Sequence, residues 1–267
     1  MISIEILCIG NELLSGITVN TNAHWLSQKI TDSGGFVKRI TIVRDDINEI
    51  AMAVKESLAR KPKWLIISGG LGPTYDDKTL EGVGIGIGVE LALDKRAVKM
   101  LRKSYSRHLA NYDKLNEIQL KMAMIPIGSI PIQNPVGTAP SVLIETAETK
   151  IICLPGVPKE LEAIFLESIL PQIKKIIGDF HITETSYEIV GVTETMLAPI
   201  LNKIDKSNLT DLIYLKTHPG GYTSDNKPKL RVQIISRGKN KSEVEIRYIN
   251  ISRMMHEEIC RLGGKIL

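Results

Sequence analysis

The sequence predicts an α/β protein: a three-layer α/β/α domain with a mostly parallel sheet, followed by a smaller α+β domain. Two observations carry this prediction. Strand-like and helix-like segments alternate from residue 2 to residue 68, and the segment order changes after residue 180 to strand, helix, strand, strand, helix. Strands that alternate with helices of roughly 10 to 15 residues are typical of βαβ crossovers, which build parallel sheets with helices on both faces.

Apolar runs predict the first and third of three strands, and amphipathic stretches predict helices between the strands. A helix is expected over 22–30, ending before Gly34, and a second one follows Asp46, where Asp46 and Glu49 have the spacing of a capping box. The three strands are expected at residues 2–9, 36–43 and 64–68.

The middle of the first domain continues the alternation. Pro158 is placed to begin a helix. The glycines at 82, 84, 86 and 88 alternate with β-branched residues, which is a strand-like period. Each glycine costs about 1 kcal/mol in a helix, so the helix that we favour over 82–88 needs a close backbone approach. The remaining segments are helices from 95 to about 111 and through 118–122, and strands at 141–145 and 150–154.

A domain boundary is expected near Pro171 and Gly178, which gives domains at 1–172 and 180–267. The second domain has the order β-α-β-β-α, and no internal repeat is visible. Its strands are expected at 186–192, 212–217 and 230–236, and its helices at 194–204 and 242–262.

Composition excludes several classes of protein. The chain has 267 residues, 43% of them hydrophobic and 24% charged, which is typical of a globular protein rather than a disordered one. No stretch approaches the roughly 20 apolar residues that span a bilayer. Three separated cysteines fit a reducing compartment and argue against a zinc site. We therefore expect a cytoplasmic protein without a membrane partner.

The net charge of +4 is unevenly distributed. Residues 1–168 hold 19 Lys and Arg against 19 Asp and Glu, so the whole excess lies in the last third. With 4% aromatic residues and no GxxG loop in that part, nucleic-acid binding is not favoured.

The segment SGGLGPTYDDKT, residues 68–79, is the most informative one for function. Gly69, Gly70 and Gly72 allow backbone amides to turn toward a bound anion, so the segment predicts a phosphate-binding loop. It is neither a Walker A loop nor GxGxxG. Asp76 and Asp77 would repel a phosphate unless a divalent cation lay between them, which predicts a magnesium-type site. The alternative is that both aspartates cap a helix.

Other polar residues follow the predicted strands and are expected at the same edge of the sheet. Asp45 belongs to a second acidic pair that supports a metal or positions water, or simply forms a solvated turn. Glu12, Asn20 and Asn22 can bind a ribose or a base edge, and their alternative is capping. No histidine or serine pattern of covalent catalysis is present.

The segments GNELLSG, NTNA, VRDD, SGGLGPTYDDKT, NPVGTAP and LPGVPKEL together resemble the N-terminal region of the CinA family. That region belongs to the molybdopterin-binding superfamily, which includes MogA and MoaB. The resemblance covers residues 3–170, and residues 180–267 resemble the KH-like domain that follows in CinA-type chains. It implies a molybdopterin-binding-like fold whose site takes a phosphorylated nucleotide or pterin with a metal.

The activity implied by the resemblance is metal-dependent hydrolysis of a nucleotide diphosphate, ADP-ribose to AMP and ribose 5-phosphate, or of FAD and related dinucleotides. The alternative is molybdopterin binding or adenylylation in molybdenum cofactor synthesis. Asp77 and Asp45 would be catalytic, with the acting base left open, and Asp45, Asp76 and Asp77 would hold Mg²⁺, Mn²⁺ or Co²⁺. A homo-oligomer, dimer or trimer, is expected. The implied substrate-binding residues are Gly10, Glu12, Asn20, Asn22, Gly69, Gly70, Gly72, Pro73, Thr74, Thr79, Asn134, Gly137, Thr138 and Gly156.

Overall fold

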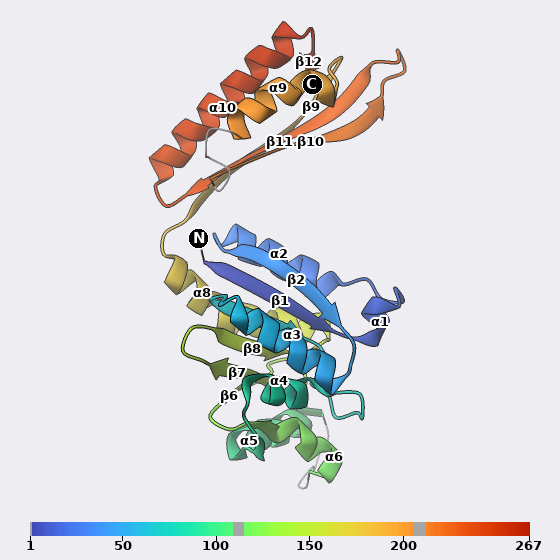
Figure 1. Cartoon of the computed structure of the whole chain (residues 1–267), viewed down its shortest axis with the longest axis vertical. Helices are drawn as coiled ribbons and strands as arrows, with labels where there is room; N and C mark the ends of the chain where they lie inside the picture. Colours follow the sequence, from blue (N-terminus) through green and yellow to red (C-terminus); the bar gives the residue numbers. More distant parts are fainter. Residues whose placement is uncertain (1, 109–114, 206–211) are drawn as a thin grey trace. The chain divides into compact units, whose positions relative to one another are not determined.

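A computed structural model describes residues 2–108, 115–205 and 212–267 (Figure 1). The chain forms two compact units, Met1–Ile177 and Gly178–Leu267, and each is described by itself. Among the described residues, no helix combines the length and apolar character that crossing a membrane requires.

A six-stranded sheet forms the centre of the first unit, in the order β2-β1-β3-β8-β7-β6. The pairs β1/β2, β1/β3 and β3/β8 are parallel, whereas β8/β7 and β7/β6 are antiparallel. The predicted mostly parallel sheet is therefore confirmed. The strands are β1 (Ser3–Ile9), β2 (Phe36–Val43), β3 (Trp64–Ser68), β6 (Ile130–Ile132), β7 (Ser141–Glu145) and β8 (Lys150–Leu154).

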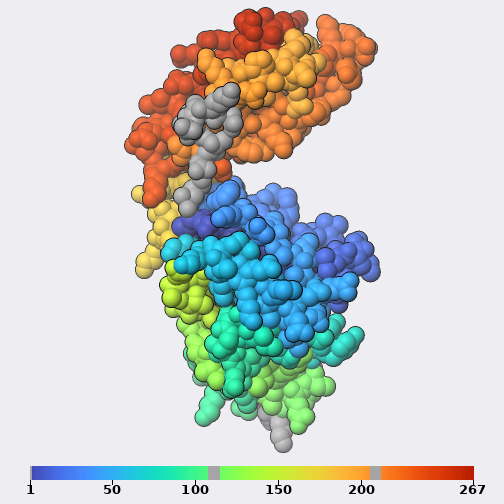
Figure 2. Space-filling model, in the orientation of Figure 1, coloured from blue at the N-terminus to red at the C-terminus, as the bar shows by residue number. Residues whose placement is uncertain are grey.

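Helices cover both faces of this sheet. Since successive side chains of a strand point to opposite faces, a strand presents side chains to both helical layers. Leu7 and Ile9 of β1 pack in one apolar cluster with Ile50 of α3. The other layer contains α2, whose Trp25 ring lies 5.7 Å from Phe165. In Figure 2, blue and cyan residues, which include those of α3, form much of the visible surface of the first unit. The helices are α2 (Thr21–Asp32), α3 (Ile47–Ala59), α4 (Thr79–Ile87), α5 (Lys95–His108), α7 (Pro158–Ile164), a π-helix (Phe165–Ile169) and α8 (Leu170–Ile177).

The glycine-rich segment is a helix, as expected, and its glycines allow it to lie directly against α3. A Cβ added to Gly82 would lie 2.6 Å from Ile50 Cβ, and one added to Gly86 would lie 2.8 Å from Val54 Cβ. The cost of glycine within α4 is therefore offset by close helix packing.

Replacing Gly82 with alanine is expected to destabilise the first unit despite the gain in helix propensity. Overpacking costs about 1 to 3 kcal/mol, and the helix gains about 1 kcal/mol, so a net loss of up to about 2 kcal/mol is expected in urea unfolding. Ile85→Ala, at an exposed position of the same helix, is the control and should change stability by less than about 0.5 kcal/mol. An unchanged or raised unfolding midpoint for Gly82→Ala would contradict the packing explanation.

Several short elements differ from the sequence predictions. Within the segment GNELLSG, where no helix was predicted, Asn11–Leu14 forms the one-turn helix α1. The predicted end of the helix near residue 111 lies outside the described residues. The stretch 118–122 is divided between α6 (Glu117–Leu120) and a 3₁₀ turn (Lys121–Ala123). The strands β4 (Leu91–Leu93), β5 (Met124–Pro126) and β6 have three residues each, too few for a periodic pattern.

Asp46 caps α3 as predicted, but Glu49 does not complete the predicted capping box. The Asp46 carboxylate accepts hydrogen bonds from the amides of Asn48 and Glu49. The Glu49 carboxylate accepts from the amide of Arg44 at 3.3 Å rather than from that of Asp46. The cap therefore lacks the reciprocal bond of a capping box.

A buried ion pair joins β1 to the end of α3. Glu5 is 2% exposed and accepts two hydrogen bonds from the Arg60 guanidinium, Nε to Oε1 at 2.8 Å and Nη2 to Oε2 at 2.7 Å. Burial alone would raise the pKa of the Glu5 carboxyl, but hydrogen bonds from Arg60 and Ser57 outweigh it and lower that pKa. The carboxylate is therefore held in its charged form inside the sheet.

The second unit contains the predicted order of strand, helix, two strands and helix, with one more strand at its end. Its antiparallel sheet has the order β10-β11-β9-β12. Strand β9 begins five residues before the predicted start, because its first half is mostly polar and gives no apolar signal, although it pairs with β11. The elements are β9 (His181–Val190), α9 (Glu194–Asp205), β10 (Ile213–Tyr222), β11 (Pro228–Gly238), α10 (Lys241–Arg261) and β12 (Lys265–Ile266).

Candidate functional site

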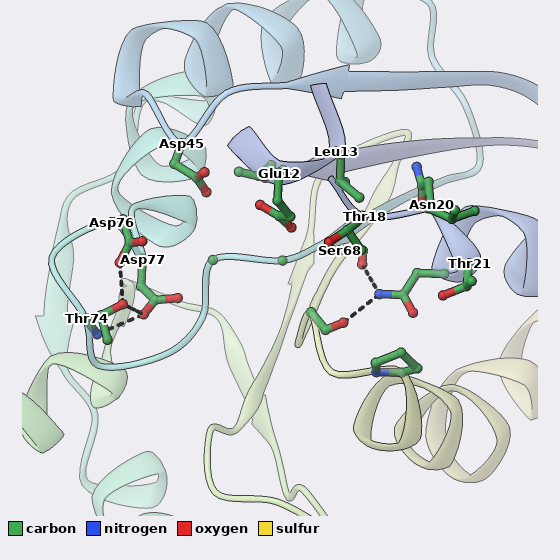
Figure 3. A pocket seen from close by; sticks show the side chains of 18 residues that line it. Glu12, Leu13, Thr18, Asn20, Thr21, Asp45, Ser68, Thr74, Asp76 and Asp77 are labelled. Carbon is green, nitrogen blue, oxygen red and sulfur yellow. Dashed lines mark hydrogen bonds between the residues drawn. The ribbon is translucent and has the colours of Figure 1, made fainter. Parts of the chain in front are cut away.

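A cavity of about 260 Å³ lies at the carboxyl ends of β1, β3 and β8 (Figure 3). Parallel strands present their carboxyl ends at one edge, so the loops after them meet there. The predicted site residues that line the cavity are Gly10, Glu12, Asn20, Asn22, Asp45, Gly69, Gly70, Thr74, Asp76, Asp77 and Gly156.

Six predicted site residues do not line this cavity. Asn134 is fully buried and closes its own turn: its Nδ2 donates to Glu160 Oε2 at 2.6 Å, and its Oδ1 accepts from the Gly137 amide at 2.7 Å. Thr79 is buried, and its hydroxyl donates to the Gly69 carbonyl at 2.8 Å. The turn at 134–138, whose residues the resemblance implies as substrate-binding, is therefore a structural turn. The six residues are Gly72, Pro73, Thr79, Asn134, Gly137 and Thr138.

Two glycines shape the loop after β3. Gly69 has φ +108° and Gly70 has φ +63°, both in the region that favours glycine. A Cβ on Gly69 would collide with the Ile9 carbonyl, and one on Gly70 with the Thr79 hydroxyl. Gly72 has no positive φ, and its amide faces Asp77.

The anion that this loop binds is a carboxylate of the protein itself. The Gly72 amide donates to Asp77 Oδ1 at 2.8 Å, and the Thr74 amide donates to Asp77 Oδ2 at 2.8 Å. The Gly69 amide donates to the Leu154 carbonyl at 3.1 Å. The predicted phosphate cradle is thus largely filled by Asp77. In the described part of the chain, the amides of Gly70 and Leu71 donate to no protein acceptor.

Asp76 and Asp77 do not cap α4, so the alternative interpretation of this pair is wrong. The N-cap of α4 is Lys78, which makes no side-chain capping bond. Asp76 contacts the Thr74 hydroxyl, and this hydrogen bond lowers the pKa of the Asp76 carboxyl. Lys121 Nζ donates to the Thr74 carbonyl at 2.6 Å and ties the acidic loop to the 3₁₀ turn.

Asp45 and Glu12 occupy the side of the cavity opposite this loop. Asp45 Oδ2 accepts from the Asn11 amide at 2.8 Å at the start of α1. The Glu12 carboxylate lies against Gly10 and accepts no hydrogen bond from the described residues. Figure 3 shows the side chains of Glu12, Asp45 and Asp77 directed toward a common space.

Hydrogen bonds of the Asn20 and Asn22 side chains fix the third side of the cavity. Asn22 Nδ2 donates to Ser68 Oγ at 3.1 Å and to the Gly156 carbonyl at 2.8 Å, which joins α2 to the ends of β3 and β8. Asn20 Oδ1 accepts from the Ala23 amide at 3.0 Å, so Asn20 caps α2, and from the Cys8 thiol at 3.7 Å. Burial raises the pKa of Cys8, which keeps this thiol protonated.

Some lining residues were missed by sequence reasoning. Thr18, Thr21 and Ser68 offer hydroxyls to the cavity, but isolated hydroxyl residues in loops have no pattern that distinguishes them. The position of Ser68 at the end of a buried strand was the one available signal. The full set of missed residues is Ile9, Leu13, Thr18, Val19, Thr21, Ser68 and Pro158.

All charged side chains among the described residues that line the cavity are negative. Four carboxylates line it, those of Glu12, Asp45, Asp76 and Asp77, and no Lys, Arg or His stands among the described lining residues. A phosphate entering alone would meet uncompensated like charge. The described residues include no group of three acidic, His or Cys side chains arranged for a metal. The donor set nevertheless suits Mg²⁺, which usually takes one or two carboxylates together with ligand phosphates and water.

Comparisons with known proteins agree with the architecture. A family model for the probable molybdopterin binding domain matches residues 5–175. A protein of Sulfurisphaera tokodaii is 41% identical over 263 residues, 98% of this chain and 97% of its own. One of Metallosphaera sedula is 40% identical over 263 residues, 98% of this chain and 96% of its own.

Among solved structures, CinA of Thermoplasma acidophilum, described as having unknown function, is 42% identical with a TM-score of 0.59. The match covers 64% of this chain and 98% of that one. The family model and the full-length relatives together show that this chain belongs to the family defined by the probable molybdopterin binding domain.

Proposed function

We propose that the cavity binds a phosphorylated pterin of the molybdopterin kind together with a divalent cation. The observation that carries the proposal is the combination of four carboxylates and no cationic side chain in the described lining of the site, within a domain of this family. Such a site favours an anion only when a cation accompanies it.

Asp45 and Glu12 are the residues best suited to hold that cation. Asp45 has one oxygen that accepts no hydrogen bond from the described residues, and the Glu12 carboxylate has two. Both Asp77 oxygens already accept backbone amides, so Asp77 acts mainly by positioning the loop. This differs from the assignment implied by the resemblance, in which Asp76 and Asp77 hold the metal together with Asp45, and from the sequence prediction that Glu12 binds a ribose or a base edge.

The phosphate would meet the amide of Gly70, which lines the cavity and donates to no acceptor among the described residues. Backbone amides at a glycine turn before a helix are common phosphate donors. The bound cation supplies charge neutralisation between this phosphate and the carboxylates. Thr18, Thr21 and Ser68 add hydroxyl donors at the cavity wall.

The test is calorimetric titration with 6-hydroxymethylpterin diphosphate, with and without Mg²⁺. We expect binding that requires Mg²⁺ and weakens about tenfold or more in Asp45→Asn and Glu12→Gln, because each removes one charged ligand. Glu90→Gln, at an exposed position outside the cavity, should bind as the wild type does. Magnesium-independent binding, or equal binding by all three variants, would contradict the proposal.

Hydrolysis of a nucleotide diphosphate bond is the second candidate, favoured by the same excess of carboxylates. A divalent metal would neutralise the diphosphate and polarise a water. The measurement is AMP release from ADP-ribose with Mg²⁺, Mn²⁺ or Co²⁺, compared with Asp45→Asn. If wild type and variant release AMP equally slowly in every metal, the hydrolysis candidate is overturned.

A further inference from the structure

A second cavity adjoins the first across the glycine loop. It has a volume of about 210 Å³, and Gly70 and Asp77 line both cavities. The remaining wall comes from α4, β4 and the turn that precedes β5. No residue of this wall belongs to the predicted site except Gly72.

The two cavities differ in chemistry. Leu71, Leu80 and Met122, which are 5%, 8% and 3% exposed, form an apolar floor in the second cavity, and Met124 is half-buried beside them. Methionine side chains adapt to flat surfaces and make favourable sulfur–aromatic contacts. The second cavity therefore suits a planar ring, whereas the first suits a metal-bound anion.

Size also points to joint use of the cavities. Pockets for small ligands usually measure roughly 300 to 1,000 Å³. Each cavity alone is smaller than that, at about 260 and 210 Å³. A ligand with an anionic part and a ring part would fill both cavities and pass beside Gly70 and Asp77, which line both.

We propose that the second cavity holds the heteroaromatic ring of the ligand whose phosphate lies in the first cavity, and that Glu81 selects a pterin ring. This assignment rests on the proposed function. Glu81 is exposed in the first turn of α4, lines the second cavity, and its carboxylate has no hydrogen bond with the described residues.

The hydrogen-bonding edge of the ligand ring decides whether Glu81 favours pterin or adenine. A carboxylate accepts two parallel hydrogen bonds from adjacent donors. The amino-pyrimidinone edge of a pterin presents such a pair, a ring N–H beside an amino group. The pairing edge of adenine presents a bare ring nitrogen beside its amino group, so it would place an acceptor against Glu81. The carboxylate therefore favours pterin over adenine.

Three Mg²⁺-bound probes separate the two cavities: pyrophosphate, which has no ring, 6-hydroxymethylpterin diphosphate and ADP. The variants are Glu81→Gln, which keeps side-chain size at an exposed position, and Met124→Trp, which fills the second cavity. Glu90→Gln is the control on the same surface segment.

Glu81→Gln should weaken pterin diphosphate about tenfold while leaving pyrophosphate unchanged and ADP no weaker. Met124→Trp should weaken both ring-bearing probes and spare pyrophosphate. If pyrophosphate binds and neither variant changes its ratio to pterin diphosphate, the ring assignment is overturned while the proposed function stands. Failure of every probe to bind the wild type overturns both.

Discussion

Replacing Asp77 with asparagine is expected to weaken ligand binding about tenfold or more, although the side chain keeps its size. The carboxylate accepts the amides of both Gly72 and Thr74. Asparagine has one acceptor oxygen, so its amino group would face one of these N–H donors. Losing a hydrogen bond to a charged group costs about 1.5 to 3 kcal/mol. The loop should open, and hydrogen exchange at residues 72 and 74 should accelerate.

Asp76→Asn is the matched control because it is the same change at the next residue. The Asp76 side chain contacts the Thr74 hydroxyl rather than the loop amides, so exchange at residues 72 and 74 should stay slow. Equal acceleration in both variants would mean that loss of negative charge, and not loss of the two acceptors, opens the loop.

Arg60→Met is expected to produce the largest loss of stability in the first unit, about 3 to 5 kcal/mol at neutral pH. The substitution leaves Glu5 charged and buried without its bidentate partner, and breaking one side of a buried pair typically costs that amount. Urea unfolding measures it. Lys61→Met removes an exposed pair with Glu148 and should cost less than about 1 kcal/mol.

Arg60→Met should also reverse the contribution of Glu5 to the pH dependence of stability. In the wild type the pKa of Glu5 is lowered from 4.5, so its contribution is complete above that value and is lost as pH falls through the folded pKa. Without Arg60, burial raises the pKa of Glu5, and protonation then relieves the buried charge. The stability difference between wild type and Arg60→Met should therefore begin to shrink above pH 4.5, where Glu5 of the variant takes up its proton, and should shrink further as pH falls through the lowered pKa of the wild type. A constant difference would contradict this account.

Sequence reasoning predicted the elements whose periodic patterns are long. The strands 36–43, 64–68, 141–145 and 150–154 occur at the predicted residues. The last three are short, almost fully buried and mostly apolar runs, whereas 36–43 is a partly exposed strand at the sheet edge. Sequence reasoning also placed Asp45, Asp77 and Glu12 at one edge of the sheet, since topology alone brings those loops together.

What sequence reasoning could not predict was the partner of each polar group. NPVGTAP has the composition of a ligand-binding turn, but Glu160, 26 residues away from Asn134 in sequence, takes its side-chain amide. In the same way, the spacing of SGGLGPTYDD suggested amides aimed at a phosphate, and only the folded loop shows that Asp77 accepts two of them. Local sequence specifies donors and acceptors, whereas tertiary structure decides their pairing.

The occupation of the glycine loop by Asp77 has a consequence for the entropy of binding. A phosphate loop that is ordered by its ligand must lose backbone freedom on association, at about 1 to 2 kcal/mol per fixed residue. Here an internal carboxylate already holds Gly72 and Thr74 in place. The loop loses its backbone freedom during folding. A ligand that binds later therefore orders less of the protein, and the entropy loss on binding is smaller.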